Sequence, residues 1–169
     1  MNASLTTVIR LETPRDATKV RAVLEAAFAR PAEADLVERL RERGDLVLAL
    51  VSERSEGLAG YVAFPRLTLV ADGRTIPVVG LAPVGVIPAM QRHGIGSALI
   101  RAGLARLKDR GEGIVFVLGA PDYYGRFGFE VRAEYTSRYT GPHFQALRLS
   151  PFAPPSGTVS YPPPFAELE

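Results

Sequence analysis

Apolar residues along the chain are spaced in two ways, and the two spacings predict a succession of strands and helices. Apolar positions three and four residues apart predict helices from Thr13 to Ala29, from Ala34 to Arg43 and from Ile95 to Arg110. Alternating or continuous apolar runs predict strands. We expect strands at Ser4 to Leu11, Leu46 to Ser52, Leu58 to Val70, Val79 to Val86, Ile114 to Leu118 and His143 to Leu149.

The order of these segments predicts a mixed sheet. Short polar turns join the strands 46–52, 58–70 and 79–86, which is typical of an antiparallel meander. The helix that begins at Ile95 then connects the strand 79–86 to the strand 114–118, and a right-handed crossover of this kind places its two strands parallel. The expected architecture is therefore α/β (α+β), with helices flanking a central mixed sheet.

Length and composition fit one folded domain. The chain has 169 residues, of which 47% are hydrophobic and 22% are charged, as in ordinary globular proteins. It contains no cysteine, which excludes disulfides, thiol nucleophiles and cysteine-ligated metal. Its two histidines, His93 and His143, lie far apart in the sequence, so we expect no metal site.

The charge distribution argues against a nucleic-acid partner. The formal net charge is +2, and the arginines are spread along the chain without a dense basic run interleaved with aromatic residues. The first residues lack a basic segment followed by an apolar core, and no apolar run is long enough to span a bilayer. We therefore expect a cytoplasmic protein with neither a nucleic-acid nor a membrane partner.

A glycine loop lies between the fourth expected strand and the helix that begins at Ile95. Its sequence is Gln91-Arg92-His93-Gly94-Ile95-Gly96-Ser97. The first turn of a helix has N–H groups without intrahelical partners and a positive electrostatic potential, so such a loop suits an anion. Gly94 and Gly96 lack a β-carbon and would let a pyrophosphate approach the backbone. The alternative is a tight turn that needs glycine only for its backbone angles.

Two other phosphate-binding loops fit this segment poorly. A dinucleotide-binding loop has a third glycine where Leu99 stands, and it normally follows the first strand of its domain. A P-loop has a lysine before its Ser or Thr, and no lysine is present here.

Two motifs resemble the GNAT acetyltransferase superfamily. Gln91, Gly94 and Gly96 match its Gln/Arg-x-x-Gly-x-Gly/Ala signature, and the segment from Tyr124 to Phe129 is similar to its Tyr-x-x-x-Gly-Phe motif. The resemblance covers nearly the whole chain and extends to the YhbS-like subgroup of small bacterial acetyltransferases. It implies the acyl-CoA N-acyltransferase fold, in which a mixed sheet of about six to seven strands has flanking helices.

The resemblance also implies a reaction and the residues that carry it out. An acetyl group would pass from acetyl-CoA directly to the amine of a small molecule or protein. Tyr124 would be the general acid that protonates the leaving thiolate. The residues implied in binding acetyl-CoA are Val84, Gly85 and Val86 beside the pantetheine arm, and Gln91, Arg92, His93, Gly94, Ile95, Gly96 and Ser97 around the pyrophosphate.

Other features depart from well-studied members of the superfamily. The segment 114–118 has no glutamate to act as a general base, and Val117 stands where an asparagine is often found. Glu33, Asp35 and the two histidines are alternatives for the base, or are solvated surface residues. The chain therefore has a second interpretation as a non-catalytic acyl-CoA-binding regulatory module, and a third as a nucleotide-binding protein.

The segment after Ser150 is rich in proline, including Pro162-Pro163-Pro164. This composition is typical of a loose terminus, whereas Phe152, Tyr161 and Phe165 favour packing against the rest of the chain. We expect residues 1–149 to form a single GNAT-like domain and residues 150–169 to form a tail packed on it. The sequence leaves two oligomeric states open, a monomer and a homodimer.

Overall fold

The computed structural model describes residues 6–168. Ser4 and Leu5 of the first expected strand lie outside the described residues. The structure has the mixed sheet and flanking helices that the sequence predicts. Its helices are α1 (Ala17–Phe28), α2 (Ala32–Arg43), α3 (Ile95–Asp109) and the short α4 (Pro121–Tyr124).

Nine strands of the described chain form one sheet. Six of them follow the order β1-β2-β3-β4-β6-β8, in which only β4 and β6 run parallel. The strands are β1 (Val8–Leu11), β2 (Leu46–Arg54), β3 (Gly57–Ala71), β4 (Arg74–Leu81), β5 (Val84–Val86), β6 (Ile114–Leu118), β7 (Tyr135–Thr136), β8 (Phe144–Arg148) and β9 (Gly157–Ser160).

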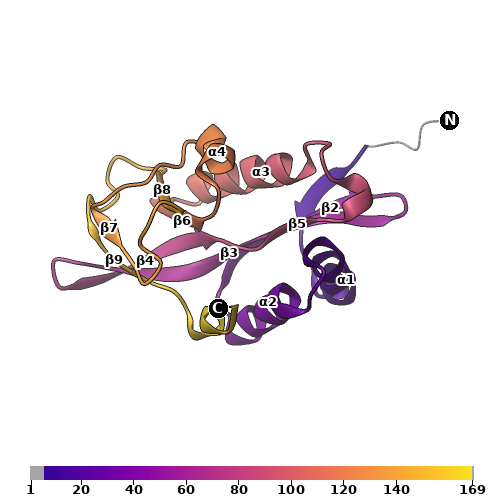
Figure 1. Cartoon of the computed structure of the whole chain (residues 1–169), viewed down its shortest axis with the longest axis horizontal. Helices are drawn as coiled ribbons and strands as arrows, with labels where there is room; N and C mark the ends of the chain where they lie inside the picture. Colours follow the sequence, from indigo (N-terminus) through magenta and orange to yellow (C-terminus); the bar gives the residue numbers. More distant parts are fainter. Residues whose placement is uncertain (1–5, 169) are drawn as a thin grey trace.

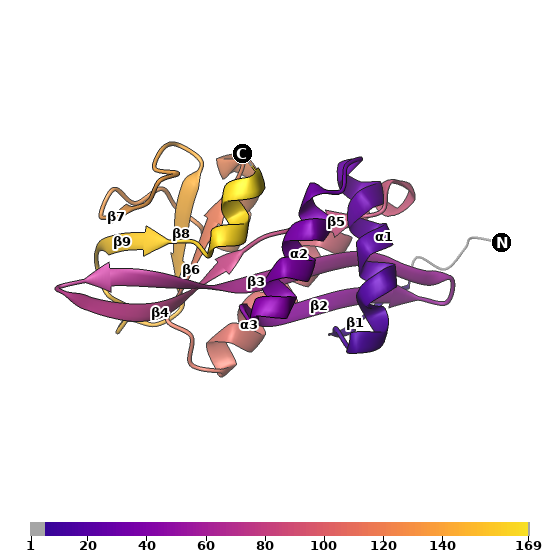
Figure 2. The ribbon, with the colours of Figure 1, turned by 90° about the horizontal axis from the view of Figure 1, so that it is seen from below.

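The long strand β3 organises the sheet, because it has different partners in its two halves. On one edge it pairs with β2 and then with β9, and on the other edge with β5 and then with β4. The helices α1 and α2 cover one face of the sheet, and α3 and α4 lie on the other (Figures 1 and 2).

The apolar face of α3 forms the main core with the sheet. Leu99, Ile100 and Leu107 are fully buried there against side chains that include Val62 and Phe64. Gly103 is the position of closest approach, since a β-carbon built on it would lie 2.2 Å from Cε2 of Phe64. The ring of Phe64 therefore occupies the space that any side chain at this position would need.

The strand expected from Val79 to Val86 is interrupted in the structure. Ala63 of β3 accepts a hydrogen bond from the Ala82 N–H and donates one to the Pro83 carbonyl, both at 3.0 Å. Ala82 and Pro83 thus both lie opposite Ala63, and this two-to-one pairing is a β-bulge. Proline suits this position because it has no N–H to contribute to a continuous ladder. The prediction of a single strand was wrong, and β4 and β5 are separate elements.

The end of the chain lies against both the sheet and α2. Strand β9 pairs with β3 through Thr158, Val159 and Ser160. A 3-10 helix follows at Pro163–Leu168, and its Phe165 packs with Leu36 and Leu40 of α2.

A charged network ties β1 to the start of α1. Arg10 donates hydrogen bonds to both oxygens of Asp16 at 2.8 and 2.9 Å, and the Thr13 N–H donates to the same carboxylate at 2.7 Å. The Arg10 guanidinium holds the pKa of the buried Asp16 carboxyl well below its usual range, although burial acts in the opposite direction.

We expect Gly103→Ala to destabilise the protein by about 1 to 3 kcal/mol, because the added methyl overpacks against Phe64. Replacing a glycine by alanine within a helix usually increases stability, so a loss of stability here would be opposite to the usual effect. Urea unfolding monitored by circular dichroism measures the change. In the double-mutant cycle with Phe64→Leu, the two changes should cost less together than the sum of their separate costs, and a simply additive cycle would contradict the contact.

We also expect stability to fall as the pH drops below about 4. The unfolded chain has Asp16 at its ordinary pKa of about 3.9, so it binds this proton before the folded chain does. Asp16→Asn should destabilise by about 1 to 3 kcal/mol at pH 7 and flatten the acid limb of the stability profile. Unfolding at pH 7 and pH 3 measures both effects. The control is Glu42→Gln on the exposed side of α2, and an unchanged acid limb in Asp16→Asn would contradict the assignment.

Candidate functional site

The sheet is open between β5 and β6. Strand β6 pairs with β4 from Val79 to Leu81, and β5 beyond the bulge pairs with β3 alone within the described chain. The bulge bends the strand and increases its twist, so β5 diverges from β6. The extra residue also reverses the alternation, because Val79 and Leu81 before it and Val84 and Val86 after it all pack into the core beneath α3.

The backbone of Val84 and Val86 faces this opening. Pro83 and Ile87 direct their hydrogen bonds to Ala63 and Ala59 of β3. Since alternate residues of a strand point their backbone groups to opposite edges, those of Val84 and Val86 point away from β3. The carbonyl of Val86 accepts a hydrogen bond of 3.0 Å from Gln91 Nε2.

The glycine loop turns sharply into α3. Arg92 and Gly94 have left-handed backbone angles, with φ of 67° and 79°. The first hydrogen bond of α3 runs from the Ala98 N–H to the Gly94 carbonyl at 3.0 Å. The N–H groups of Ile95, Gly96 and Ser97 precede this bond and have no hydrogen-bond acceptor among the described residues. They remain available to an external anion.

A hollow with a volume of about 340 Å³ lies in front of these N–H groups. It is lined by Val86, Met90, Gln91, Arg92, Gly94, Ile95, Gly96, Ser97, Tyr123 and Arg126. The lining includes two arginines and no carboxylate. The two arginines and the positive end of the α3 dipole therefore both favour the binding of an anion in the hollow.

The two adjacent tyrosines have different positions. The Tyr123 hydroxyl lies in the hollow, 3.3 Å from Ser97 Oγ. The Tyr124 ring packs over Gly119, where a β-carbon would lie 2.4 Å from its Cε2. Tyr124 is half-buried, and its hydroxyl makes no hydrogen bond within the described chain. Burial raises the pKa of Tyr124 to about 12, with a smaller contribution from Tyr123.

The structure brings most of the implied binding residues together, but not all of them. Val84 does not line the hollow, although one of its methyl groups lies 4.0 Å from where a β-carbon on Gly96 would be. Gly85 faces the opposite way and abuts α1, since a β-carbon on it would lie 3.1 Å from that of Ala27. His93 is exposed and does not line the hollow.

Three residues that line the hollow were not predicted from the sequence. Tyr123 and Arg126 come from the second motif, and Arg126 lies over the Tyr123 ring with 4.6 Å between guanidinium carbon and ring centroid. Met90 precedes the loop. The polar side chains of Tyr123 and Arg126, next to or within the second motif, could have indicated a binding role. Only the fold, however, brings them to the N-terminal end of α3.

The alternatives for a general base differ sharply in exposure. Glu33 is buried, with a side chain only 5% exposed, whereas the Asp35 side chain is 45% exposed and paired with Arg21. His143 is exposed like His93. Val117 is buried in the core on β6. The interpretation as a solvated charge therefore fits Asp35 but is wrong for Glu33.

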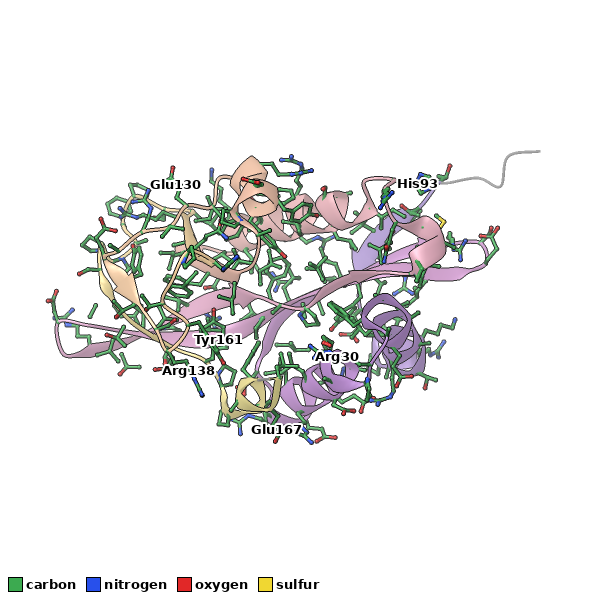
Figure 3. All side chains as sticks on the ribbon, in the orientation of Figure 1. Arg30, His93, Glu130, Arg138, Tyr161 and Glu167 are labelled. Carbon is green, nitrogen blue, oxygen red and sulfur yellow. The ribbon has the colours of Figure 1, made fainter. Side chains whose placement is uncertain are left out.

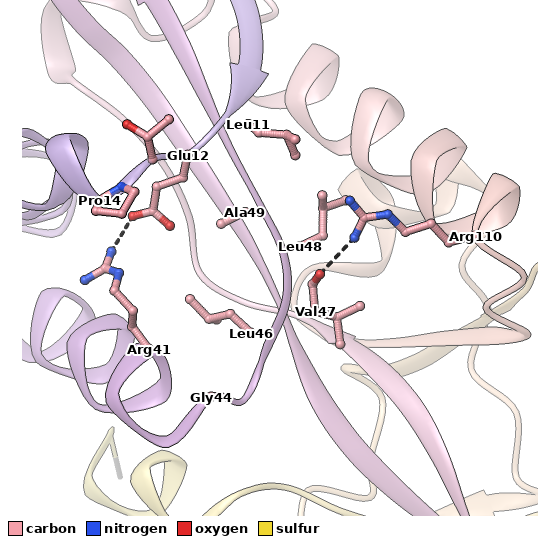
Figure 4. Close-up of a pocket in the computed structure, with 11 residues that line it drawn as sticks. Leu11, Glu12, Pro14, Arg41, Gly44, Leu46, Val47, Leu48, Ala49 and Arg110 are labelled. Carbon is pink, nitrogen blue, oxygen red and sulfur yellow. Dashed lines mark hydrogen bonds and ion pairs between the residues drawn. The ribbon is translucent and has the colours of Figure 1, made fainter.

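A second hollow, of about 370 Å³, lies at the opposite end of α3 (Figure 4). It borders the start of β2, where β1 does not cover the strand edge. Its charged groups already have partners in the protein. Glu12 is paired with Arg41, and Arg110 Nη1 donates to the Val47 carbonyl at 3.0 Å. The free N–H groups and unmatched arginines are found at the other hollow, which makes that one the candidate site.

The described residues contain no group of three or more side chains suited to hold a metal ion. Among them we also find no helix with the length and apolar character needed to cross a membrane.

The arrangement suits a ligand with an anionic group and an extended polar arm. The anion would accept hydrogen bonds from the start of α3, and the arm could lie along the edge of β5 that has no neighbouring strand. The aromatic residues from Tyr123 to Phe129 belong to the same apolar cluster as Val84 and Val86, and Tyr124 is a protonated phenol among them.

Comparisons with known proteins agree with this geometry. Residues 8–132 match the family described as acetyltransferase (GNAT) domain. The chain is 39% identical over 148 residues to the uncharacterized N-acetyltransferase YhbS of Escherichia coli K12, covering 85% of this chain and 87% of that protein.

Two solved structures are similar over nearly the whole chain. The crystal structure of E. coli YhbS in complex with CoA superposes with a TM-score of 0.88 at 37% identity, covering 98% of this chain and 95% of that one. A GNAT acetyltransferase from Brucella melitensis in complex with acetyl-CoA gives a TM-score of 0.82 at 37% identity, with coverages of 95% and 98%. The fold expected from the resemblance is confirmed, and the chain belongs to the GNAT family of N-acetyltransferases.

Proposed function

We propose that this protein binds acetyl-CoA in the opening between β5 and β6 and transfers the acetyl group directly to an amine. The observation that carries the proposal is the row of free N–H groups on Ile95, Gly96 and Ser97, which face a hollow lined by two arginines and no carboxylate. These groups would hold the pyrophosphate. The backbone edge of Val84 and Val86 would bind the pantetheine arm, and Gln91 would position the carbonyl of Val86.

Bound acetyl-CoA supplies a thioester, whose acetyl carbon forms a bond to the amine nitrogen as its bond to sulfur breaks. Tyr124 would donate its phenolic proton to the departing sulfur and recover a proton from water, while the new amide nitrogen releases its extra proton to water. With Tyr124 at a pKa of about 12 and a thiol at about 8.5, full transfer in the resting site is uphill by roughly 5 kcal/mol. Because the Tyr124 phenolate would regain a proton from water at neutral pH, the net protonation of the thiolate is nevertheless favourable.

The Val86 N–H would stabilise the negative charge that develops on the acetyl oxygen, since this N–H points away from β3 at the edge of the opening. Because no cysteine is present, direct attack by the amine replaces a thiol-bound intermediate. Pairing of β9 with β3 supports a single GNAT-like domain on which the proline-rich tail after residue 149 is packed. Use of acetyl-CoA, an intracellular metabolite, supports a cytoplasmic enzyme.

Gly96→Val should weaken CoA binding by at least about tenfold, or about 1.4 kcal/mol, because the new side chain would fill the space in front of the N–H groups and the Tyr123 hydroxyl. Isothermal titration with CoA measures the loss. Ala98→Val, on the exposed side of the same helical turn, is the matched control. Equal affinity in the two variants would contradict the assignment of this hollow to the pyrophosphate.

Tyr124→Phe should lower kcat by about 10²- to 10⁴-fold, as expected for loss of a general acid, and leave CoA affinity unchanged. Release of free thiol from acetyl-CoA with a panel of amines measures turnover. Tyr123→Phe, which removes only the contact with Ser97, is the control and should act mainly on KM for acetyl-CoA.

With a pKa of about 12, Tyr124 stays protonated at neutral pH and should add no basic limb to the rate profile below about pH 11.

Unchanged turnover in Tyr124→Phe would overturn the acid role. Stabilisation of the wild-type protein by CoA without thiol release for any amine would instead favour the non-catalytic module.

A further inference from the structure

The connection between α1 and α2 lies over the opening of the sheet, on the face opposite α3. The end of α1 contacts β5, where Gly85 meets Ala27 and Phe28. Leu36 of α2 belongs to a small apolar cluster against which Ala82 of the bulge and Tyr161 pack. In Figure 3, Arg30 and Tyr161 lie on the side of the sheet covered by α1 and α2, and His93 lies on the side of α3. An acceptor that approaches the opening from this side would meet residues 29–33.

Glu33 is the buried carboxylate of this connection. It precedes Leu36 by three residues, so the two side chains lie on the same side of α2, and Leu36 shares an apolar cluster with Ala82 of the bulge. Its side chain is 5% exposed. Its partner in the described chain is Arg30, whose Nε donates to both carboxylate oxygens at 2.6 and 3.0 Å. A carboxylate held in this position can accept hydrogen bonds from an ammonium group.

The other edge of the Arg30 guanidinium is unused. Nη1 and Nη2 of Arg30 donate no hydrogen bond within the described chain, and the side chain is 55% exposed. The neighbouring arginine on α1 is different, because Arg21 is paired with Glu25, Asp35 and Glu38 at 2.7 to 2.9 Å. Arg30 thus presents two free donors that match the geometry of a carboxylate.

We propose that the acceptor is a small amine that carries a carboxylate close to its amino group, as in an amino acid. Glu33 binds the amino group and Arg30 binds the acid. The exchange keeps every charge paired, since the acceptor replaces the contact between Arg30 and Glu33 with one contact to each residue. An amine without an acid group would leave Arg30 unpaired beside a second positive charge. This inference rests on the proposed acetyl transfer and narrows its substrate.

The test measures thiol release from acetyl-CoA with the proteinogenic amino acids, each compared with its carboxamide and with the corresponding decarboxylated amine. At least one amino acid should show kcat/KM at least about tenfold above both derivatives, the effect of one charge-assisted contact. In Arg30→Gln that preference should disappear, through a higher KM for the acid and a lower KM for the carboxamide, whose amino group no longer meets an unpaired guanidinium. Glu33→Gln should lower kcat/KM for both compounds.

Arg43→Gln is the matched control, because Arg43 also pairs with a carboxylate through Nε, at 2.8 Å, and is 48% exposed. It should retain the wild-type preference. Acetylation of carboxamides or simple amines as fast as of amino acids would overturn the inference while leaving the acetyltransferase activity in place. Acetylation of no amino acid would overturn it as well. CoA titration of the same variants, which should remain unaffected, shows separately whether the cofactor hollow is intact.

Discussion

The β-bulge at Ala82 and Pro83 is the constraint from which the geometry of the site follows. Two residues face Ala63 at this point, so the strand that began beside β6 continues along β3 in a different direction. A regular ladder would have placed β5 against β6 and satisfied its backbone groups inside the sheet. The bulge instead leaves the edge of Val84 and Val86 without a strand partner. An unpaired edge within a sheet is costly unless a ligand or water covers it, which makes this edge a natural binding surface.

The bulge also decides what each side of the opening contains. By adding one residue it keeps the valines of β5 beneath α3 and turns Gly85 towards α1. The absence of a side chain at Gly85 lets Ala27 and Phe28 approach closely, and this contact brings the connection to α2 over the opening. The glycine loop and the pair of Arg30 and Glu33 therefore lie on opposite sides of the sheet. A group-transfer enzyme needs such an arrangement, because its two substrates must meet without competing for one pocket.

Electrostatics differ between the two sides. On the side of α3, free N–H groups and two arginines meet no carboxylate, which suits a diphosphate. On the side of α2, one buried carboxylate and one arginine neutralise each other. Under the proposed acceptor assignment, the latter arrangement would favour a ligand that carries both charges, since binding a single charge would leave a partner unpaired. The side chain of Tyr124 lies within an aromatic cluster with Phe129, and burial raises its pKa to about 12.

The sequence by itself determined the local elements and the chemistry of the loop. The periods of apolar residues predicted α1, α2, α3 and most strands, because amphipathic patterns depend only on which face is buried. The glycines at 94 and 96 and the segment from Tyr124 to Phe129 indicated the family. Tertiary structure decided the rest. A bulge depends on pairing between strands, which the sequence of one strand does not reveal. The interruption at Pro83 therefore could not be recognised within an apolar run that looked continuous. Likewise, the burial of Glu33, and the placement of Tyr123 and Arg126 beside Ser97, arise from contacts between segments far apart in the chain. Periodicity within one segment carries no information about such contacts.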